Sequence, residues 1–170
     1  MSDPKQSLTQ VFEDAIEGTD EFRGELTIIV AAEKILAITA HCKNSPDLAY
    51  NYLSGITALD YYPDEPRFGI CYHLYSMRHN HRLRLKVMWS DGDADVESVT
   101  SVWPNANWFE REVFDMFGIP FANHPDLRRI LMADDWDGHP LRRDYPLGYE
   151  TVQFSFNYDE VNKHKPFAKK

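Results

Sequence analysis

The sequence predicts an α+β fold with an N-terminal helix, a mostly antiparallel four-stranded sheet packed with helices, and an extended irregular C-terminal segment. Three observations support this prediction. The chain has 170 residues, 43% of them hydrophobic and 14% aromatic, which is enough for one buried core. Its middle part alternates apolar and polar residues with the period of strands. After residue 119 the periodic patterns stop for about thirty residues, which is unusual in a compact isolated domain.

The N-terminal part of the chain predicts two helices and one strand. Apolar residues recur at helical spacing after Ser7, which also begins a capping-box pattern, and Gly18 is the expected stop of this helix. The β-branched run of residues 25–30 predicts a strand. Residues 33–42 predict a second helix, which ends before an Asn-Ser-Pro sequence.

The middle of the chain supplies the rest of the sheet. Residues 52–61, 67–75 and 82–89 predict three strands, separated by a proline-rich turn and a polar turn. In residues 82–89, Leu, Val and Trp alternate with Arg, Lys and Met, which is typical of a half-buried strand with a charged outer face. Together with residues 25–30 these make four strands. Residues 96–102 are short and ambiguous between strand and loop.

One further helix is expected over residues 107–117. Asn107 is its candidate N-cap, Glu110 follows three residues later as in a capping box, and Gly118 supplies the stop. The next regular pattern comes only at residues 151–158, which alternate like an edge strand. The segment between is long and irregular, so we expect something to hold it in place.

Charge and composition exclude several classes of function. The formal net charge of −9 disfavours a nucleic-acid binder, because such proteins depend on phosphate contacts. No apolar stretch approaches the roughly 20 residues of a membrane span, and the first residues lack the apolar core of a signal peptide. Cys42 and Cys71 are too few to ligate an iron–sulfur cluster alone, and we expect reduced thiols in a cytoplasmic protein.

The densest chemistry lies in residues 110–131, and residues 138–147 repeat its His-Pro, Arg-Arg and Asp theme. Charges this dense beside aromatic residues are costly to bury unless they are paired. The candidate site residues are Glu110, Arg111, Glu112, Asp115, Phe117, His124, Arg128, Arg129, His139, Arg142, Arg143 and Asp144.

Two functions fit these residues. Carboxylates beside His124 could supply general acid–base chemistry, although no nucleophile elbow, phosphate loop or His-Glu-x-x-His pattern accompanies them. Alternatively the charges form ion pairs, with Arg111 and Asp115 paired at i, i+4, and with Glu112 and Asp115 paired to the two downstream Arg-Arg sequences. We favour ion pairing, because planar guanidinium groups suit carboxylates.

Two possible metal patterns fail on ligand chemistry. His73, His79 and His81 could suggest a cluster, but the last two fall in an expected hairpin turn, where polar residues are ordinary. Residues 135–138 resemble a fragment of a calcium loop that lacks the first carboxylate and the bidentate Glu. We therefore expect no metal ligand, no cofactor-binding residue and no catalytic residue in this chain.

The two blocks resemble the signature of a known family, the 30-kilodalton subunit of respiratory complex I, which is the C-type subunit of bacterial NADH–quinone oxidoreductase. The residues that carry the resemblance are Glu110-Arg111-Glu112, Asp115-Met116-Phe117, His124, Arg128, Ile130, Leu131 and the block 138–147. Residues 52–61 and 72–76 are also similar to the family. The resemblance therefore spans about residues 48–147.

This resemblance implies a scaffold subunit in the peripheral arm of a proton-translocating NADH:quinone oxidoreductase. It implies a peripheral location at the cytoplasmic face of the plasma (inner) membrane or an equivalent energy-transducing membrane. NADH, FMN, iron–sulfur clusters and quinone would be bound by other subunits. The implied partners are the 49-kilodalton-type subunit (the D-type subunit) and other peripheral-arm subunits. We accordingly divide the chain into a 30-kilodalton-type α+β domain, residues 1–120, and an extended segment, residues 121–170, that docks on the partner.

Several alternatives stay open. The same scaffold role in a ferredoxin-fed, photosynthetic-type dehydrogenase or in a membrane-bound hydrogenase fits the motifs equally, because other subunits choose the electron donor. A stand-alone carboxylate- or metal-dependent enzyme and an interaction domain outside respiration are more distant alternatives.

Overall fold

The computed structural model describes residues 3–146 together with Phe156, Asp159 and Lys163. Its helices are α1 (Pro4–Phe12), α2 (Ile35–Asn44) and α3 (Ala106–Phe117), with the 3-10 helices η1 (Glu13–Ala15) and η2 (Ala32–Lys34). Its strands are β1 (Ile16–Phe22), β2 (Glu25–Val30), β3 (Tyr52–Asp60), β4 (Phe68–Ser76), β5 (His81–Trp89), β6 (Val96–Glu97) and β7 (Phe121–Ala122).

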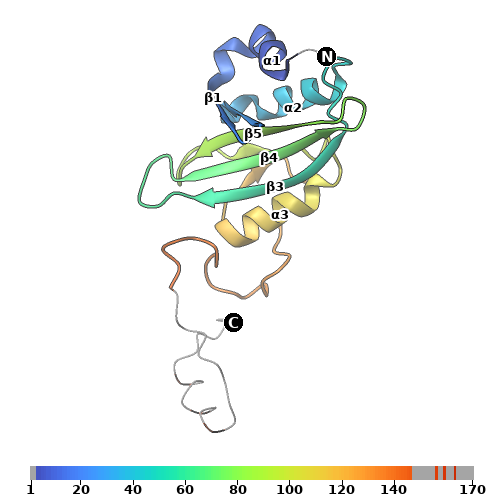
Figure 1. Cartoon of the computed structure of the whole chain (residues 1–170). Helices are drawn as coiled ribbons and strands as arrows, with labels where there is room; N and C mark the ends of the chain where they lie inside the picture. The colour runs from blue at the N-terminus through green and yellow to red at the C-terminus, as the bar shows by residue number, and fades with distance from the viewer. Residues whose placement is uncertain (1–2, 147–155, 157–158, 160–162, 164–170) are drawn as a thin grey trace.

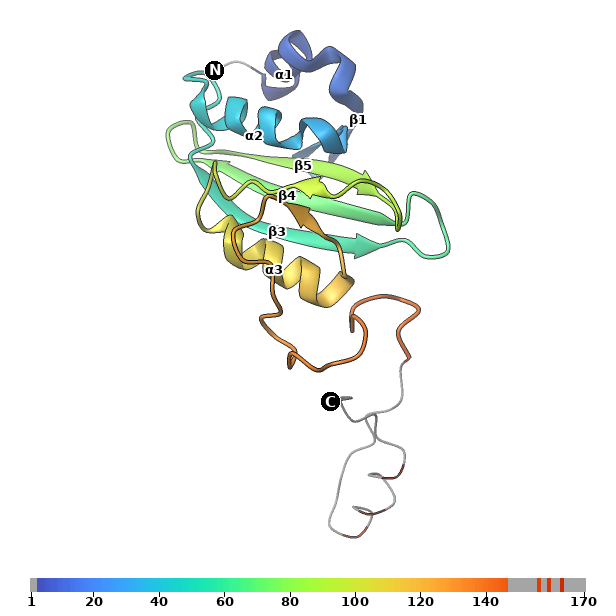
Figure 2. The same ribbon diagram turned by 180° about the vertical axis from the view of Figure 1, so that it is seen from behind.

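Five of the strands form one sheet in the order β1-β2-β5-β4-β3. All neighbours in it are antiparallel except β2 and β5, which are parallel. The helices α2 and α3 and the small parallel pair β6–β7 lie on the same side of this sheet (Figures 1 and 2). The predicted α+β class and the mostly antiparallel sheet are therefore confirmed.

The sheet has five strands rather than the four predicted, because the N-terminal helix is shorter than its apolar pattern indicates. Helix α1 begins at Pro4, where the Asp3 side chain caps it by accepting the Lys5 N–H at 3.0 Å, and it ends at Phe12. The chain then pairs with β2, and Gly18 lies opposite Ile29 in β1 instead of ending a helix. Pairing with a neighbouring strand outweighs local helix preference here.

The other elements lie close to their predicted ranges. Strand β2 has the predicted bounds, and each of β3, β4 and β5 begins and ends within one residue of its prediction. The helix expected over 33–42 is η2 followed by α2. No helix or strand occurs in the described chain between residues 123 and 146, as expected. The strand predicted over 151–158 lies outside the described residues, apart from Phe156.

The core lies between the sheet and the helices. Alternate residues of the central strands, such as Tyr72 and Leu85, point into it and are fully buried. Helix α2 contributes Ile35 and Ile38, and α3 contributes Val113. Within the described residues, no helix combines the length and apolarity needed to cross a membrane.

Helix α3 ends at Gly118 for two independent reasons. The residue has φ +76°, a left-handed conformation that side chains disfavour. A Cβ atom there would also lie 2.6 Å from the His139 ring and 3.1 Å from Nη2 of Arg142. Only glycine fits both the backbone conformation and the close approach of the later chain.

Gly118→Ala is expected to lower the free energy of unfolding by about 2 kcal/mol, because left-handed backbone costs about 1 kcal/mol and the added methyl must displace His139. Urea denaturation measures this change. Gly55→Ala is the matched control, since no atom lies within 4 Å of its would-be Cβ. The control should be neutral or slightly stabilising, and an equal loss in both variants would contradict the explanation.

Candidate functional site

Charged residues of helix α3 contact the chain on both sides of it in sequence: Arg111 and Asp115 contact the chain that follows, and Glu110 contacts the loop that precedes it. Glu110, Arg111 and Asp115 lie on its buried face. Residues 123–146, called here the return segment, run back across the C-terminal end of α3. Three clusters of polar contacts hold this segment and its approach to the domain, and they contain most of the candidate site residues.

The Asp115 cluster fixes the turn at residues 129–132. The Asp115 side chain is fully buried; its Oδ2 accepts the backbone N–H groups of Ile130, Leu131 and Met132 at 3.0, 2.7 and 2.8 Å. Its Oδ1 pairs with Nη1 of Arg129 at 2.7 Å. Burial alone would raise the pKa of Asp115, but these donors outweigh burial and hold the pKa below its usual range.

Arg111 uses its guanidinium on backbone rather than on Asp115. Its Nε donates to the carbonyl of Arg128 at 3.0 Å, and its Nη2 donates to the carbonyl of Arg129 at 2.9 Å. The same guanidinium lies over the Trp108 ring, 5.3 Å from the ring centroid, which is within the range of a cation–π contact. The predicted Arg111–Asp115 pair is therefore wrong, because Asp115 is already saturated by four donors.

The second block, residues 138–147, caps the end of α3 with its first residues. The last carbonyls of a helix have no partner within it and need outside donors. The donors are Nδ1 of His139 to Asp115 O at 2.9 Å, the Leu141 N–H to Met116 O at 3.0 Å, and Nε of Arg142 to Phe117 O at 2.5 Å. The positive charge of Arg142 also suits the negative end of the helix dipole.

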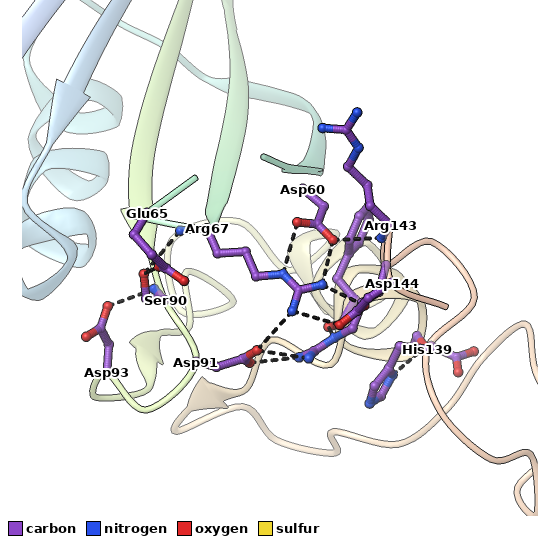
Figure 3. Close-up of polar contacts among 12 residues, drawn as sticks. Asp60, Glu65, Arg67, Ser90, Asp91, Asp93, His139, Arg143 and Asp144 are labelled. Atoms are coloured by element: carbon purple, nitrogen blue, oxygen red, sulfur yellow. Dashed lines mark hydrogen bonds and ion pairs between the residues drawn. The ribbon is translucent and has the colours of Figure 1, made fainter. Parts of the chain in front are cut away.

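The Arg67 cluster ties the second block to the sheet (Figure 3). Arg67 is only 7% exposed, and its guanidinium donates to both carboxylate oxygens of Asp60, at 3.0 and 2.8 Å. It also donates to both oxygens of Asp144, at 3.1 and 2.7 Å. These hydrogen bonds raise the pKa of Arg67, while the Arg67 guanidinium holds the pKa of Asp144 below its usual range.

Two more arginines complete this cluster. Arg142 makes a two-pronged pair with Asp91 at 2.9 and 3.0 Å. The Arg143 backbone N–H donates to Oδ2 of Asp60 at 2.8 Å, and its side chain donates to the Tyr62 carbonyl. Three arginines thus lie among three aspartates, so the cluster balances its charge internally (Figure 3).

The Glu110 cluster is closed to solvent. Glu110 is 0% exposed and accepts the Ser98 hydroxyl at 2.6 Å and the Val99 N–H at 2.8 Å. Glu110 therefore caps the loop after β6 and not its own helix. The N-cap residue of α3 is Asn105, whereas the sequence predicted Asn107. Burial raises the pKa of Glu110 to about 7, although these two hydrogen bonds oppose the shift.

His124 lies beside Glu110, with Nε2 at 3.8 Å from a carboxylate oxygen. Its Nδ1 accepts the Asp126 N–H at 3.0 Å, so the proton belongs on Nε2, which faces the Asn107 carbonyl at 3.3 Å. Burial lowers the pKa of His124. Both the Glu110 and His124 side chains are 0% exposed. A substrate therefore has no route to this pair, which disfavours the acid–base alternative.

The remaining predicted residues have mixed outcomes. Glu112 is exposed and makes no side-chain hydrogen bond or ion pair within the described residues, so its predicted pairing is wrong. The Arg128 side chain is 70% exposed and pairs only at the surface, with Asp126. Phe117 is buried and packs edge-on against Phe68. The Asp115–Arg129 pair is the expected one.

Sequence reasoning missed Asp60, Arg67, Asp91 and Ser98. A signal existed for two of them, because Asp60 and Arg67 stand at the facing ends of two predicted strands across one turn. Ser98 and Asp91 lie in short segments without a pattern. Within the described residues, no group of three or more His, Cys, Asp or Glu is arranged to hold a metal ion.

The fold and the clusters define a class of protein: an α+β domain that holds its own irregular C-terminal segment with buried and partly exposed ion pairs. Comparison with known proteins gives the particular family. The profile described as respiratory-chain NADH dehydrogenase, 30 Kd subunit, matches residues 28–151. The chain belongs to this family, which confirms the resemblance of its motifs.

Individual relatives agree with the family. The C-type subunit of NADH-quinone oxidoreductase from Roseiflexus castenholzii is 49% identical over 162 residues, covering 95% of this chain and 93% of the relative. The same subunit from Geobacter sulfurreducens is 52% identical over 141 residues, covering 82% and 86%. The chain is thus similar to these subunits over nearly their whole length.

Two solved structures share the fold. The trypsin-resistant fragment of Nqo5 is 32% identical with a TM-score of 0.63, and the match covers 72% of this chain and 98% of the fragment. A chain of the membrane-bound sulfane sulfur reductase, an archaeal respiratory membrane complex, is 25% identical with a TM-score of 0.67, covering 84% and 85%. The fold therefore also occurs in a chain of an archaeal respiratory membrane complex.

The buried Glu110 predicts a pH-dependent stability. Its folded-state pKa of about 7 lies above the ordinary value of 4.5, so its stabilising contribution is fully present below about pH 4.5 and is lost as the pH rises through 7. In Glu110→Gln this loss should disappear. The free-energy difference between parent and variant should then change by about 3 kcal/mol between acid and neutral pH, measured by urea denaturation. Glu112→Gln, at an exposed position of the same helix, should keep the parental profile, and an unchanged profile in Glu110→Gln would refute the assignment.

Asp115→Asn is expected to loosen the return segment, because removing one partner of a buried pair costs about 3–5 kcal/mol. Trypsin cleavage after Arg128 and Arg129, followed by mass spectrometry, should become faster by about tenfold or more as local opening increases. Asp126→Asn is the matched control, since the Asp126–Arg128 pair is exposed and surface pairs contribute about 0–1 kcal/mol. Equal cleavage rates in the two variants would contradict the role of Asp115.

Proposed function

We propose that this chain is a scaffold subunit in the peripheral arm of a proton-translocating NADH:quinone oxidoreductase and carries no redox centre itself. The family match and the identity of about half of the residues to its C-type subunits support membership of such a complex. NADH, FMN, the iron–sulfur clusters and quinone would be held by other subunits. The chain would assist electron transfer by positioning its neighbours at the cytoplasmic face of the membrane.

The observation that carries this proposal is the internal use of the motif charges. The buried carboxylates Asp60, Glu110 and Asp115 accept their hydrogen bonds from this chain's own donors. None of the three is left free to act on a substrate. The family motif therefore serves to build a surface, and the surface is what a partner would meet.

Large apolar side chains remain exposed on α3 and the return segment. Trp108 is 59% exposed, Leu131 is 62% exposed and Leu141 is 54% exposed. Trp and other large side chains beside arginines are typical of obligate interfaces. We propose that these residues face the 49-kilodalton-type subunit, and that the candidate site residues act by holding them in place.

The division of the chain follows the same proposal. Residues 1–120 form the 30-kilodalton-type domain, and residues 121–170 extend from it onto the partner. Strand β7 pairs with β6, so the extension starts from within the folded body. Its path as far as Pro146 is set by the Asp115 and Arg67 clusters, which would present a preformed surface to the partner and lower the entropic cost of docking.

A second candidate is the same scaffold role in a related complex with a different electron donor, such as a ferredoxin-fed dehydrogenase or a membrane-bound hydrogenase. The likeness to a chain of the sulfane sulfur reductase favours it. The higher identity to NADH-quinone oxidoreductase subunits favours the first candidate. The donor module that co-purifies with a tagged chain distinguishes the two.

Arg129→Ala should impair assembly more than it alters the chemistry of any complex that forms. It removes the charge partner of Asp115 and the donor to the Trp136 and Gly138 carbonyls. The yield of complex co-purified from solubilised membranes should fall by about tenfold or more, as expected when a buried pair is broken. The quinone KM of the residual complex should stay near the parental value.

Arg128→Ala is the matched control, because its side chain is 70% exposed and pairs only at the surface. It should assemble with nearly parental yield. A complex that assembles normally with Arg129→Ala but has a changed quinone KM would contradict the scaffold role.

A further inference from the structure

The face of the sheet opposite the helices has no helix packed on it within the described residues (Figures 1 and 2). The strand register places side chains on this open face in cross-strand rows. The rows are Gly18–Ile29–Lys86–Cys71–Thr57, Asp20–Thr27–Arg84–His73–Gly55, Arg82–Tyr75–Tyr52 and Met88–Gly69–Leu59. Most of β5's charged side chains thus lie on one surface.

A groove of about 590 Å³ runs over this open face. Its walls include Tyr52, Tyr75, Arg82 and Arg84. Gly55 also lines the groove, and a Cβ atom there would meet no atom within 4 Å. A bulge in β3 between Leu53 and Gly55 interrupts the regular pairing beside it. The groove is therefore shaped by the backbone and by the absence of a side chain at one position.

The groove is cationic in an acidic protein. The chain has a formal net charge of −9, yet the groove is lined by two arginines against the single carboxylate of Glu25. Glu25 is paired with Arg84 at 2.8 Å. The exposed Arg82 side chain has no hydrogen bond or ion pair within the described part of the chain. An anionic occupant would therefore find an uncompensated positive charge here.

Exposed apolar side chains extend the surface beyond the groove. Phe22 is 65% exposed, Tyr52 is 44% exposed and Leu59 is 48% exposed, and the register places all three on the open face. They lie on the two edge strands, β1 and β3, so a small molecule in the groove would leave two of them uncovered. An occupant that covers this face must extend across several strands.

We propose that the open face of the sheet docks an extended acidic segment of another subunit, with a carboxylate of that segment paired to Arg82 and its backbone lying over Gly55. This inference rests on the proposed function, because the partner is a subunit of the same complex. Tyrosine and arginine side chains around a hollow are the residue types that dominate binding at protein interfaces. The surface is separate from α3 and the return segment, so it would engage a second contact, independent of the motif residues.

A second copy of this chain is a poorer occupant, because two chains of net charge −9 repel each other. An anionic lipid would satisfy Arg82 but needs neither Gly55 nor the row of tyrosines. Both remain outcomes that the experiment below separates from a peptide segment.

The test uses the assembled complex, purified through a tag on this chain, with a photoreactive p-benzoylphenylalanine in place of the exposed Thr57. Illumination and mass spectrometry should give one main cross-link, to a segment rich in Asp and Glu in a stoichiometric subunit. Arg82→Glu should lower the cross-link yield by about tenfold, because it sets like charges against each other. Gly55→Trp should lower it similarly by filling the groove, since Gly55 is not in the left-handed region and a Cβ atom there would meet no atom within 4 Å.

Lys34→Glu is the matched charge control, because Lys34 is an exposed cation in η2. It should leave the cross-link yield unchanged. Cross-links to lipid, to a second copy of the chain or to no molecule in an intact complex would overturn the inference, as would a parental yield with Arg82→Glu. A tagged chain that brings down no other respiratory subunit would instead overturn the proposed function, and this inference with it.

Discussion

The four donors on the Asp115 carboxylate are the interaction on which the C-terminal half of the structure depends. Three consecutive backbone N–H groups, of Ile130, Leu131 and Met132, have no strand or helix partner and point at one side chain. All three donate to Oδ2, and an ionised carboxylate suits such converging donors because hydrogen bonds to a charged acceptor are stronger than those to a neutral one. The charge of Asp115 is then balanced by Arg129. The Asp115 side chain thus accepts backbone hydrogen bonds of the return segment that no helix or strand accepts.

Burying so many charges is tolerable because each cluster balances itself. Desolvation makes an unpaired buried charge very costly, whereas bidentate arginine–carboxylate pairs with further hydrogen bonds offset much of that cost. Arg67 meets this condition with the buried Asp60. The carboxylates of Asp144 and Asp91 are about half exposed, so their pairs with Arg67 and Arg142 carry a smaller desolvation cost. Glu110 has no arginine and is buried with a pKa raised to about 7, so there the balance is reached through protonation rather than pairing. The Arg67 cluster is therefore a lasting ionic contact, whereas the contribution of the Glu110 cluster depends on pH.

The sequence predicts what depends on local pattern and misses what depends on long-range contact. The alternation in β5 is sufficient to predict that strand, and the glycine after α3 is sufficient to predict the end of that helix, because each pattern reflects the geometry of its own segment. Strand β1 is missed because its pairing with β2 decides its conformation. The Asp115–Arg129 pair is predictable because both residues lie in the dense motif. The Arg67–Asp144 pair is not predictable, because its two residues are 77 positions apart in the chain.

The arrangement of charge separates the two faces of the molecule in a way that bears on assembly. On the helical side Arg111, Arg129 and Arg142 donate to groups of this chain, and the exposed Arg128 is paired with Asp126. A partner there therefore meets apolar side chains such as Trp108 and Leu131 and gains little from long-range attraction. On the open face of the sheet Arg82 is uncompensated, so a partner there meets charge first. Apolar contact is slow to dissociate and charge contact speeds association. A subunit with one surface of each kind can be captured early by its charged face and then held permanently by its apolar face.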